Sequence, residues 1–164
     1  MKHASIGIGV QHTLVSRCSG GEARILRGMA KRATASARAR AVPEKALVSV
    51  VDDDESVRES LPDLLRELGF AAQAFVSAEE FLTSTYVAPT RCLILDIAMP
   101  GMSGPELQQE LTRRGHDKKI IFITARSDET VRRHLLAQGA VDCLFKPFSE
   151  QELKAALDAA LPGK

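Results

Sequence analysis

The sequence predicts a doubly wound α/β domain, in which helices cover both faces of a five-stranded parallel sheet. From residue 46 onward, five short apolar runs alternate with longer segments of helical period. The runs are apolar enough to be buried on both faces, which is typical of parallel sheets. With 164 residues and 45% apolar side chains, the chain has the size and composition for one hydrophobic core. We therefore expect a single α/β domain.

The five apolar runs are the expected strands. Each is short, bounded by polar or turn-forming residues, and built mainly from Val, Ile, Leu, Phe or Ala. They comprise residues 46–51, 71–75, 91–96, 119–124 and 141–145. In a doubly wound sheet the ligand site lies beyond the carboxyl ends of the strands, so the residues that follow these runs are the first candidates for chemistry.

Amphipathic segments follow the runs and are the expected helices. The first, residues 56–68, has one apolar stripe made of Val57, Leu61, Leu64, Leu65 and Leu68. Residues 106–111, 131–138 and 152–161 have similar patterns. Three helix starts carry the Ser-x-x-Glu spacing of a capping box, namely Ser77 with Glu80, Ser103 with Glu106, and Ser149 with Glu152. These signals predict five helices alternating with the five strands.

Residues 1–45 differ in composition from the rest. They carry nine Lys and Arg against two Asp and Glu, whereas residues 46–164 carry thirteen against nineteen. The segment is rich in Ala and Arg and has little apolar surface to bury, so we expect a basic N-terminal extension that is disordered or partly helical. The folded domain is expected over residues 46–164.

No apolar stretch is long enough to span a bilayer, and the first residues lack a convincing secretory signal. The three cysteines, Cys18, Cys92 and Cys143, form no CxxC pair. Free thiols of this kind are typical of a reducing compartment. We therefore expect a cytoplasmic protein that does not insert into membranes.

Acidic residues follow two of the expected strands. Asp52, Asp53, Asp54 and Glu55 come directly after the first strand, and Asp96 ends the third. An acidic run at a helix start is also explained by the helix dipole, which favours carboxylates there by about 0.3 to 1 kcal/mol each. However, a parallel sheet can bring the carboxylates from the two strands together, where they would repel one another. Their convergence predicts a raised pKa or a bound hard cation such as Mg²⁺, which prefers oxygen ligands.

A hydroxyl and an ammonium group follow the last two strands. Thr124 ends the fourth strand, and Lys146 follows the fifth in the sequence Lys146-Pro147-Phe148. Each alone is an ordinary surface residue. Beside an acidic cluster, however, the lysine can pair with a carboxylate or neutralise the oxygens of a transferred phosphoryl group.

The motifs VSVVDDDESVRESL, LILDIAMPGMSG, FITA and FKPF resemble those of the receiver domains of bacterial two-component response regulators. The resemblance covers about residues 46–161, and its four motifs occur in the same order at successive strand ends. It implies a flavodoxin-like fold with strand order 2-1-3-4-5. It also implies that Asp96 is the phosphoacceptor and that the bond between Lys146 and Pro147 is cis, a geometry found almost only before proline.

The resemblance assigns a role to each site residue. Asp52 and Asp53 match the acidic pair that binds Mg²⁺, or Mn²⁺ in its place, together with Asp96 and the backbone carbonyl of Ala98. Thr124 matches the switch hydroxyl and Lys146 the lysine that engages the phosphoryl oxygens. The phosphoryl group would come from a sensor histidine kinase or a histidine phosphotransfer protein, and the switched domain would bind a downstream protein target. The resemblance therefore implies a phosphoacceptor in signal transduction and not a dedicated enzyme.

One position departs from the family pattern. Three residues before the lysine the family usually has Phe or Tyr, whose rotation reports phosphorylation to the surface, whereas this chain has Cys143. A buried cysteine packs as a small hydrophobe, so we interpret it as a packing substitution rather than a redox sensor. We predict that phosphorylation is preserved but that its coupling to the surface of the fourth helix and fifth strand is altered.

Three other functions are compatible with parts of the sequence. An aspartyl-phosphate phosphatase would use an Asp nucleophile and Mg²⁺, but the residue two positions after Asp96 is Ala98 and not Asp. A DNA-binding regulator would need a reading element, and the residues after Lys146 suffice only for a helix that the domain needs. The basic extension lacks interleaved aromatics, so we do not expect DNA binding. A receiver with vestigial phosphorylation would be expected to have lost some of its site residues, and all are present.

Overall fold

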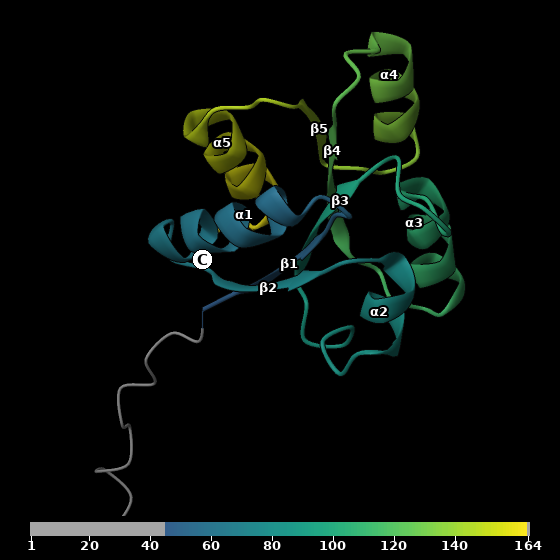
Figure 1. Cartoon of the computed structure of the whole chain (residues 1–164), viewed down its shortest axis with the longest axis horizontal. Coiled ribbons are helices and arrows are strands. Elements are labelled where there is room, and N and C mark those ends of the chain that lie inside the picture. The colour runs from purple at the N-terminus through teal and green to yellow at the C-terminus, as the bar shows by residue number, and fades with distance from the viewer. Residues whose placement is uncertain (1–44, 164) are drawn as a thin grey trace, which may run out of the picture. The chain divides into compact units, whose positions relative to one another are not determined.

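Five parallel strands form the sheet of the computed structural model, which describes residues 45–163 (Figure 1). The strands are β1 (Leu47–Val51), β2 (Ala71–Phe75), β3 (Cys92–Asp96), β4 (Lys119–Thr124) and β5 (Asp142–Phe145). All five fall within the apolar runs expected from the sequence. The predicted basic extension lies outside the described residues, apart from Lys45.

The strand order is β2-β1-β3-β4-β5, as predicted. All neighbouring strands pair in parallel, and the register places Val51 opposite Leu95 and Thr124 opposite Phe145. Because β1 and β3 are neighbours, Asp52 directly after β1 lies close to Asp96 at the end of β3. From β1 the sheet continues to β2 on one side and to β3 on the other. The direction of the strand order therefore changes between β1 and β3, where the acidic residues lie.

The helices are α1 (Glu55–Glu67), α2 (Ala78–Thr83), α3 (Gly104–Arg113), α4 (Glu129–Ala137) and α5 (Glu150–Ala160). Helices α1 and α5 cover one face of the sheet, and α2, α3 and α4 cover the other (Figure 1). Side chains alternate between the two faces along each strand. In β4, for example, Ile121 and Ile123 pack towards α1 and α5, whereas Phe122 packs on the opposite side.

The prediction that strands are buried on both faces is confirmed for β3, in which every residue is buried. It is wrong for β2, where only Phe75 is buried and the four residues before it are partly exposed. The reason is the position of β2 at the edge of the sheet, where it has one neighbouring strand instead of two.

The helix starts confirm the predicted capping residues. The Glu106 carboxylate accepts hydrogen bonds from the amide and hydroxyl of Ser103, and a full capping box joins Ser149 and Glu152 at α5. At α2 the amide of Glu80 donates to the Ser77 hydroxyl as expected. Its carboxylate, however, accepts from the amide of Val76 rather than from that of Ser77.

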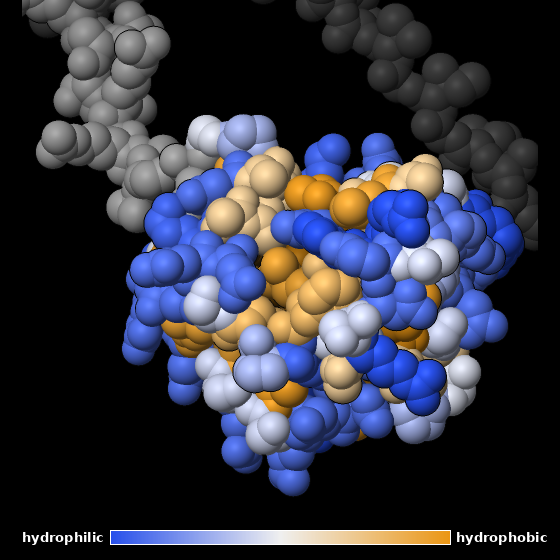
Figure 2. All heavy atoms as spheres, turned by 90° about the horizontal axis from the view of Figure 1, so that it is seen from above, coloured by the Kyte–Doolittle hydropathy of each residue, from blue (hydrophilic) through white to orange (hydrophobic). Residues whose placement is uncertain are grey.

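Most of the surface seen from above is hydrophilic, with an apolar band across the middle (Figure 2). Large apolar side chains that are clearly exposed are few among the described residues, and they are Val76, Tyr86 and Val131. Over residues 45–163 no helix is both long and apolar enough to cross a bilayer.

Candidate functional site

Lys146 joins two carboxylates at the carboxyl end of the sheet. Its Nζ donates to Oδ2 of Asp52 at 2.6 Å and to Oδ1 of Asp96 at 2.9 Å. The peptide bond after it, Lys146-Pro147, is cis, as the resemblance implied. Burial by itself lowers the pKa of Lys146, but its hydrogen bonds to the two carboxylates outweigh burial and raise that pKa above its usual value. The ammonium group therefore stays charged between the two acids.

Asp52 is the most deeply buried acid of the site, with a side chain only 1% exposed. Its Oδ1 accepts a hydrogen bond from the amide of Asp54 at 2.8 Å, and its own amide donates to the carbonyl of Phe75. Burial raises the pKa of Asp52 above its usual value, although hydrogen bonds from Lys146 and the Asp54 amide act in the opposite direction. The sequence predicted a raised pKa from repulsion between the carboxylates, whereas burial is its main cause here and the charge of Asp96 contributes least.

Asp96 is the last residue of β3 and is also buried. While Oδ1 faces Lys146, Oδ2 accepts a hydrogen bond from the amide of Ala98 at 2.7 Å. The carboxylate is therefore held at both oxygens and has little rotational freedom. A fixed carboxylate at the end of a strand is a suitable nucleophile because it needs little reorganisation before it reacts.

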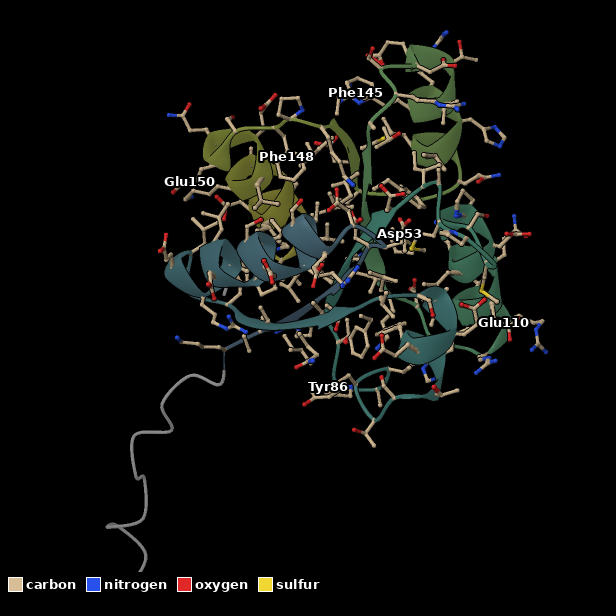
Figure 3. All side chains as sticks on the ribbon, in the orientation of Figure 1. Asp53, Tyr86, Glu110, Phe145, Phe148 and Glu150 are labelled. Atoms are coloured by element: carbon tan, nitrogen blue, oxygen red, sulfur yellow. The ribbon has the colours of Figure 1, made fainter. Side chains whose placement is uncertain are left out.

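A cleft of about 500 Å³ opens over these two acids. Its lining includes the expected site residues Asp52, Asp53, Asp96, Ala98, Thr124 and Lys146. Asp53 is exposed and lies near the middle of the unit, beside the ends of the central strands (Figure 3). On the α4 side the lining continues through Ala125, Arg126, Asp128 and Val131. The structure thus brings together every residue that the sequence singled out for this site.

Thr124 ends β4 at the rim of the same cleft and is buried. Its Oγ1 accepts a hydrogen bond from the amide of Arg126 at 3.1 Å. The hydroxyl retains its own proton for a further acceptor, so it is available to an anion bound beside Asp96.

The carboxylates fit a hard divalent cation. Among residues 45–163 no three His, Cys, Asp or Glu side chains form a ready-made metal-binding group. Mg²⁺ does not need one, because it usually takes one or two carboxylates and keeps several waters. The side chain of Asp53 makes no hydrogen bond among the described residues. The carboxylates of Asp52 and Asp96 lie close enough together for one cationic group, the Lys146 ammonium, to contact both. This oxygen-rich donor set suits Mg²⁺ better than a soft metal.

The loop between β3 and α3 is fixed by contacts that the sequence did not reveal. The amide of Gly104 donates to the carbonyl of Ile97, and a Cβ at Gly104 would overlap the carbonyl oxygen of Asp96. On α2, the Glu79 carboxylate accepts a hydrogen bond from the amide of Met102 at 3.1 Å. Contacts from both α2 and α3 therefore fix the loop that follows Asp96.

Arg58 is another residue that sequence reasoning missed. It lies on α1, and its Nη1 donates to the backbone carbonyl of Asp52 at 3.0 Å. The only sequence signal was its position six residues after Asp52, on the helix that follows the acidic run. That spacing alone does not distinguish it from the other arginines.

Cys143 is buried in the core between the sheet and helices α2 to α4, with Phe122 and Leu135 in the same cluster. Burial raises the pKa of its thiol to about 11, so the thiol stays protonated and is a poor nucleophile. This supports the packing interpretation over a redox role. The aromatic residue at this end of β5 is instead Phe145, which is half-buried, pairs with Thr124 and lies near α4 (Figure 3). Altered coupling to the surface stays a prediction.

Comparison with known proteins gives consistent matches. Residues 48–158 match the family model described as the response regulator receiver domain. Nodulation protein W of Bradyrhizobium diazoefficiens is 47% identical over 116 residues, which are 71% of this chain and 51% of that protein. The chain spans about half the length of the curated relatives it matches.

Solved structures agree with the sequence matches. The response regulator StyR superposes with a TM-score of 0.65 and 45% identity, over 71% of this chain and 59% of that one. The response regulator TrrA of Thermotoga maritima, solved in complex with Mg²⁺ and BeF, has a TM-score of 0.62 and 34% identity, over 71% of this chain and 99% of that one. The fold described above is therefore that of response regulator structures.

Proposed function

The chain belongs to the family of response regulator receiver domains, and from this premise we propose that Asp96 accepts a phosphoryl group from a histidine of a partner protein. The observation that carries the proposal is the position of Lys146, whose ammonium lies between the carboxylates of Asp52 and Asp96 in a cleft that also contains Asp53 and Thr124. Such a site can hold an anionic phosphoryl group next to an anionic nucleophile.

In the proposed reaction an oxygen of the Asp96 carboxylate attacks the phosphorus of a phosphohistidine. A phosphorus–oxygen bond forms as the phosphorus–nitrogen bond breaks, and the electron pair of the broken bond goes to the imidazole nitrogen, which takes up a proton. The product is an acyl phosphate on Asp96. Hydrolysis of this acyl phosphate returns the carboxylate and releases inorganic phosphate.

The other residues of the site act on the oxygens of the transferred group. Lys146 offers a positive charge and three hydrogen-bond donors, and the Thr124 hydroxyl offers one. Asp52, Asp53, Asp96 and the carbonyl of Ala98 would hold Mg²⁺, or Mn²⁺ in its place. The ion supplies positive charge that reduces the repulsion between the carboxylate and the phosphoryl group.

The movement of Thr124 and Lys146 towards the phosphoryl oxygens would shift the loops that carry them and so change the binding of a protein target. The donor would be a sensor histidine kinase or a histidine phosphotransfer protein. Such a protein would act in the cytoplasm as a regulator, not as a metabolic enzyme.

The direct test is phosphorylation of the full chain by acetyl phosphate in the presence of Mg²⁺, followed by mass spectrometry of the intact protein. We expect the mass increase of one phosphoryl group on the wild type and none on Asp96→Asn. Asp117→Asn is a matched control, because it removes an acid remote from the cleft. A phosphoryl adduct on Asp96→Asn, or none on the wild type, would contradict the proposal.

A further inference from the structure

Arg58 makes an unusual contact for an arginine beside an acidic run. It is half-buried on α1, and its guanidinium donates to the main-chain carbonyl of Asp52. Within residues 45–163 it forms no ion pair with a carboxylate, even though four acids lie at positions 52–55. On the same helix Arg66 forms an ion pair with Asp63. The position of Arg58 is therefore set by a backbone group and not by a charged partner.

The carbonyl that Arg58 holds belongs to the first residue after a buried strand. Pairing of β1 with both neighbouring strands ends at Val51, so the carbonyl of Asp52 lies beyond the strand register. A buried carbonyl without a partner costs free energy, and the guanidinium supplies that partner. The contact thereby ties the first turns of α1 to the end of β1.

The same carbonyl is part of the peptide unit that leads into Asp53. A peptide unit is planar, so a fixed Asp52 carbonyl also fixes the direction in which the chain enters Asp53. The Asp53 side chain has no hydrogen bond of its own among the described residues. Its position therefore depends on the backbone, and the backbone at this point is held by Arg58.

We propose that Arg58 is a positioning residue of the metal site, which sets the affinity for Mg²⁺ by orienting the Asp52–Asp53 peptide unit. The inference rests on the proposed function, because it concerns the same site. The permanent charge of the guanidinium by itself disfavours a second cation nearby, so its contribution to Mg²⁺ affinity comes from the orientation of the peptide unit and not from its charge. Partners that orient metal ligands typically change metal affinity by about 10- to 100-fold when they are removed.

The test measures Mg²⁺ binding to full-length variants. The chain has no tryptophan, so the affinity is followed by the amide NMR shifts of residues 52–54 during titration with MgCl₂. We expect Arg58→Met to weaken binding about 10-fold. Arg58→Lys should weaken Mg²⁺ binding less than Arg58→Met, because an ammonium group can still donate a hydrogen bond to the Asp52 carbonyl. Arg66→Met, which removes an exposed arginine from the same helix, should bind Mg²⁺ like the wild type.

A purely structural role would lower the urea midpoint without changing the affinity of the folded protein for Mg²⁺. Wild-type affinity in Arg58→Met, or an equal loss in Arg66→Met, would overturn the inference. If Arg58→Met does not fold, the Mg²⁺ affinities of Arg58→Lys and Arg58→Gln provide the test. Wild-type affinity in both of these variants would overturn the positioning role of Arg58. If the wild type itself does not bind Mg²⁺, the metal site of the proposed function fails as well. Asp96 phosphorylation by acetyl phosphate at saturating Mg²⁺ tests that function separately.

Discussion

Gly104 has no free space for a side chain. As the first residue of α3 it lies against the backbone of Asp96, and an added Cβ would also come within 3.1 Å of the Phe122 ring. The neighbouring atoms are backbone and a buried ring, so they cannot move aside easily. The absence of a side chain at this position therefore helps to define where Asp96 lies.

We predict that Gly104→Ala displaces Asp96. Overpacking of this kind costs about 1 to 3 kcal/mol in the free energy of unfolding, and the shifted carboxylate should also be phosphorylated more slowly. Urea unfolding and the initial rate with acetyl phosphate measure the two effects.

Gly115→Ala is the matched control, because Gly115 has a left-handed φ of +76° but no atoms within 4 Å of the position that a Cβ would occupy. It should cost about 1 kcal/mol from backbone strain alone and leave phosphorylation unchanged. An unaltered rate in Gly104→Ala would show that Asp96 is not constrained by α3.

At the residue scale, the sequence revealed the groups that carry charge at strand ends but not those that hold them in place. Asp96 and Lys146 could be predicted because each follows an apolar run, and parallel strands end at one edge. Arg58, Glu79 and Gly104 could not, because their roles depend on backbone atoms that are distant in sequence or on a close approach. Such contacts leave no periodic pattern.

Helix α3 is stabilised at its C-terminal end by an acid that faces two arginines. Glu110 accepts hydrogen bonds from Arg113 and Arg114 at 2.6 to 2.7 Å. The hydrogen bonds from Arg113 and then from Arg114 lower the pKa of Glu110 to about 2, from an ordinary value of 4.5. The folded state therefore favours the ionised form of this side chain.

This shift predicts the sign of a pH effect on stability. Because the pKa is lower in the folded state, the stabilisation by Glu110 is complete above pH 4.5 and is lost as the pH falls from 4.5 to about 2. The difference in unfolding free energy between the wild type and Glu110→Gln should decrease over that interval. Glu110 and its two arginines lie at the surface, so the difference should also be small and should decrease with added salt.

Urea unfolding of both proteins across this pH range measures the effect. Glu67→Gln serves as the control, because it removes an exposed glutamate from α1 that has no ion pair among the described residues. A difference for Glu110→Gln that grows as the pH falls would contradict the argument.

At the element scale, the apolar runs and serine caps predicted the type and order of the helices and strands over residues 45–163. The burial of β2 was predicted wrongly, because its sequence Ala-Ala-Gln-Ala-Phe resembles a buried strand whereas its environment depends on which strands lie beside it. Strand order came from the family resemblance. Composition does not encode it, because several orders bury the same apolar faces.

The whole domain acts as the scaffold of the site, because the acidic residues come together only when β1 and β3 pair. A ligand that binds this arrangement binds the folded state and not the unfolded chain. Mg²⁺ binding should therefore be linked to global stability. The assignment of residues 1–45 as a separate extension stays a prediction, because those residues fall almost entirely outside the part described.

We predict that Mg²⁺ raises the unfolding free energy of the wild type by about 2.7 kcal/mol at a concentration of about 100 times its dissociation constant. The unfolding free energy of Asp53→Asn should not rise when Mg²⁺ is added. Because Asp53 is exposed and its side chain makes no hydrogen bond within residues 45–163, the substitution should change stability little without Mg²⁺. Urea unfolding with and without MgCl₂ measures both values, and an equal gain in the two proteins would place the ion elsewhere.

The bridging position of Lys146 has a consequence for the order of binding events. Lys146 contacts one oxygen of Asp52 and one of Asp96, so a cation held by these carboxylates would compete with the ammonium for their negative charge. By thermodynamic reciprocity, the free energy by which Lys146 would weaken cation binding equals the free energy by which the cation would weaken the contacts of Lys146 with these acids. Cation binding by these carboxylates would therefore weaken their contacts with Lys146 and leave its ammonium more available to a phosphoryl group.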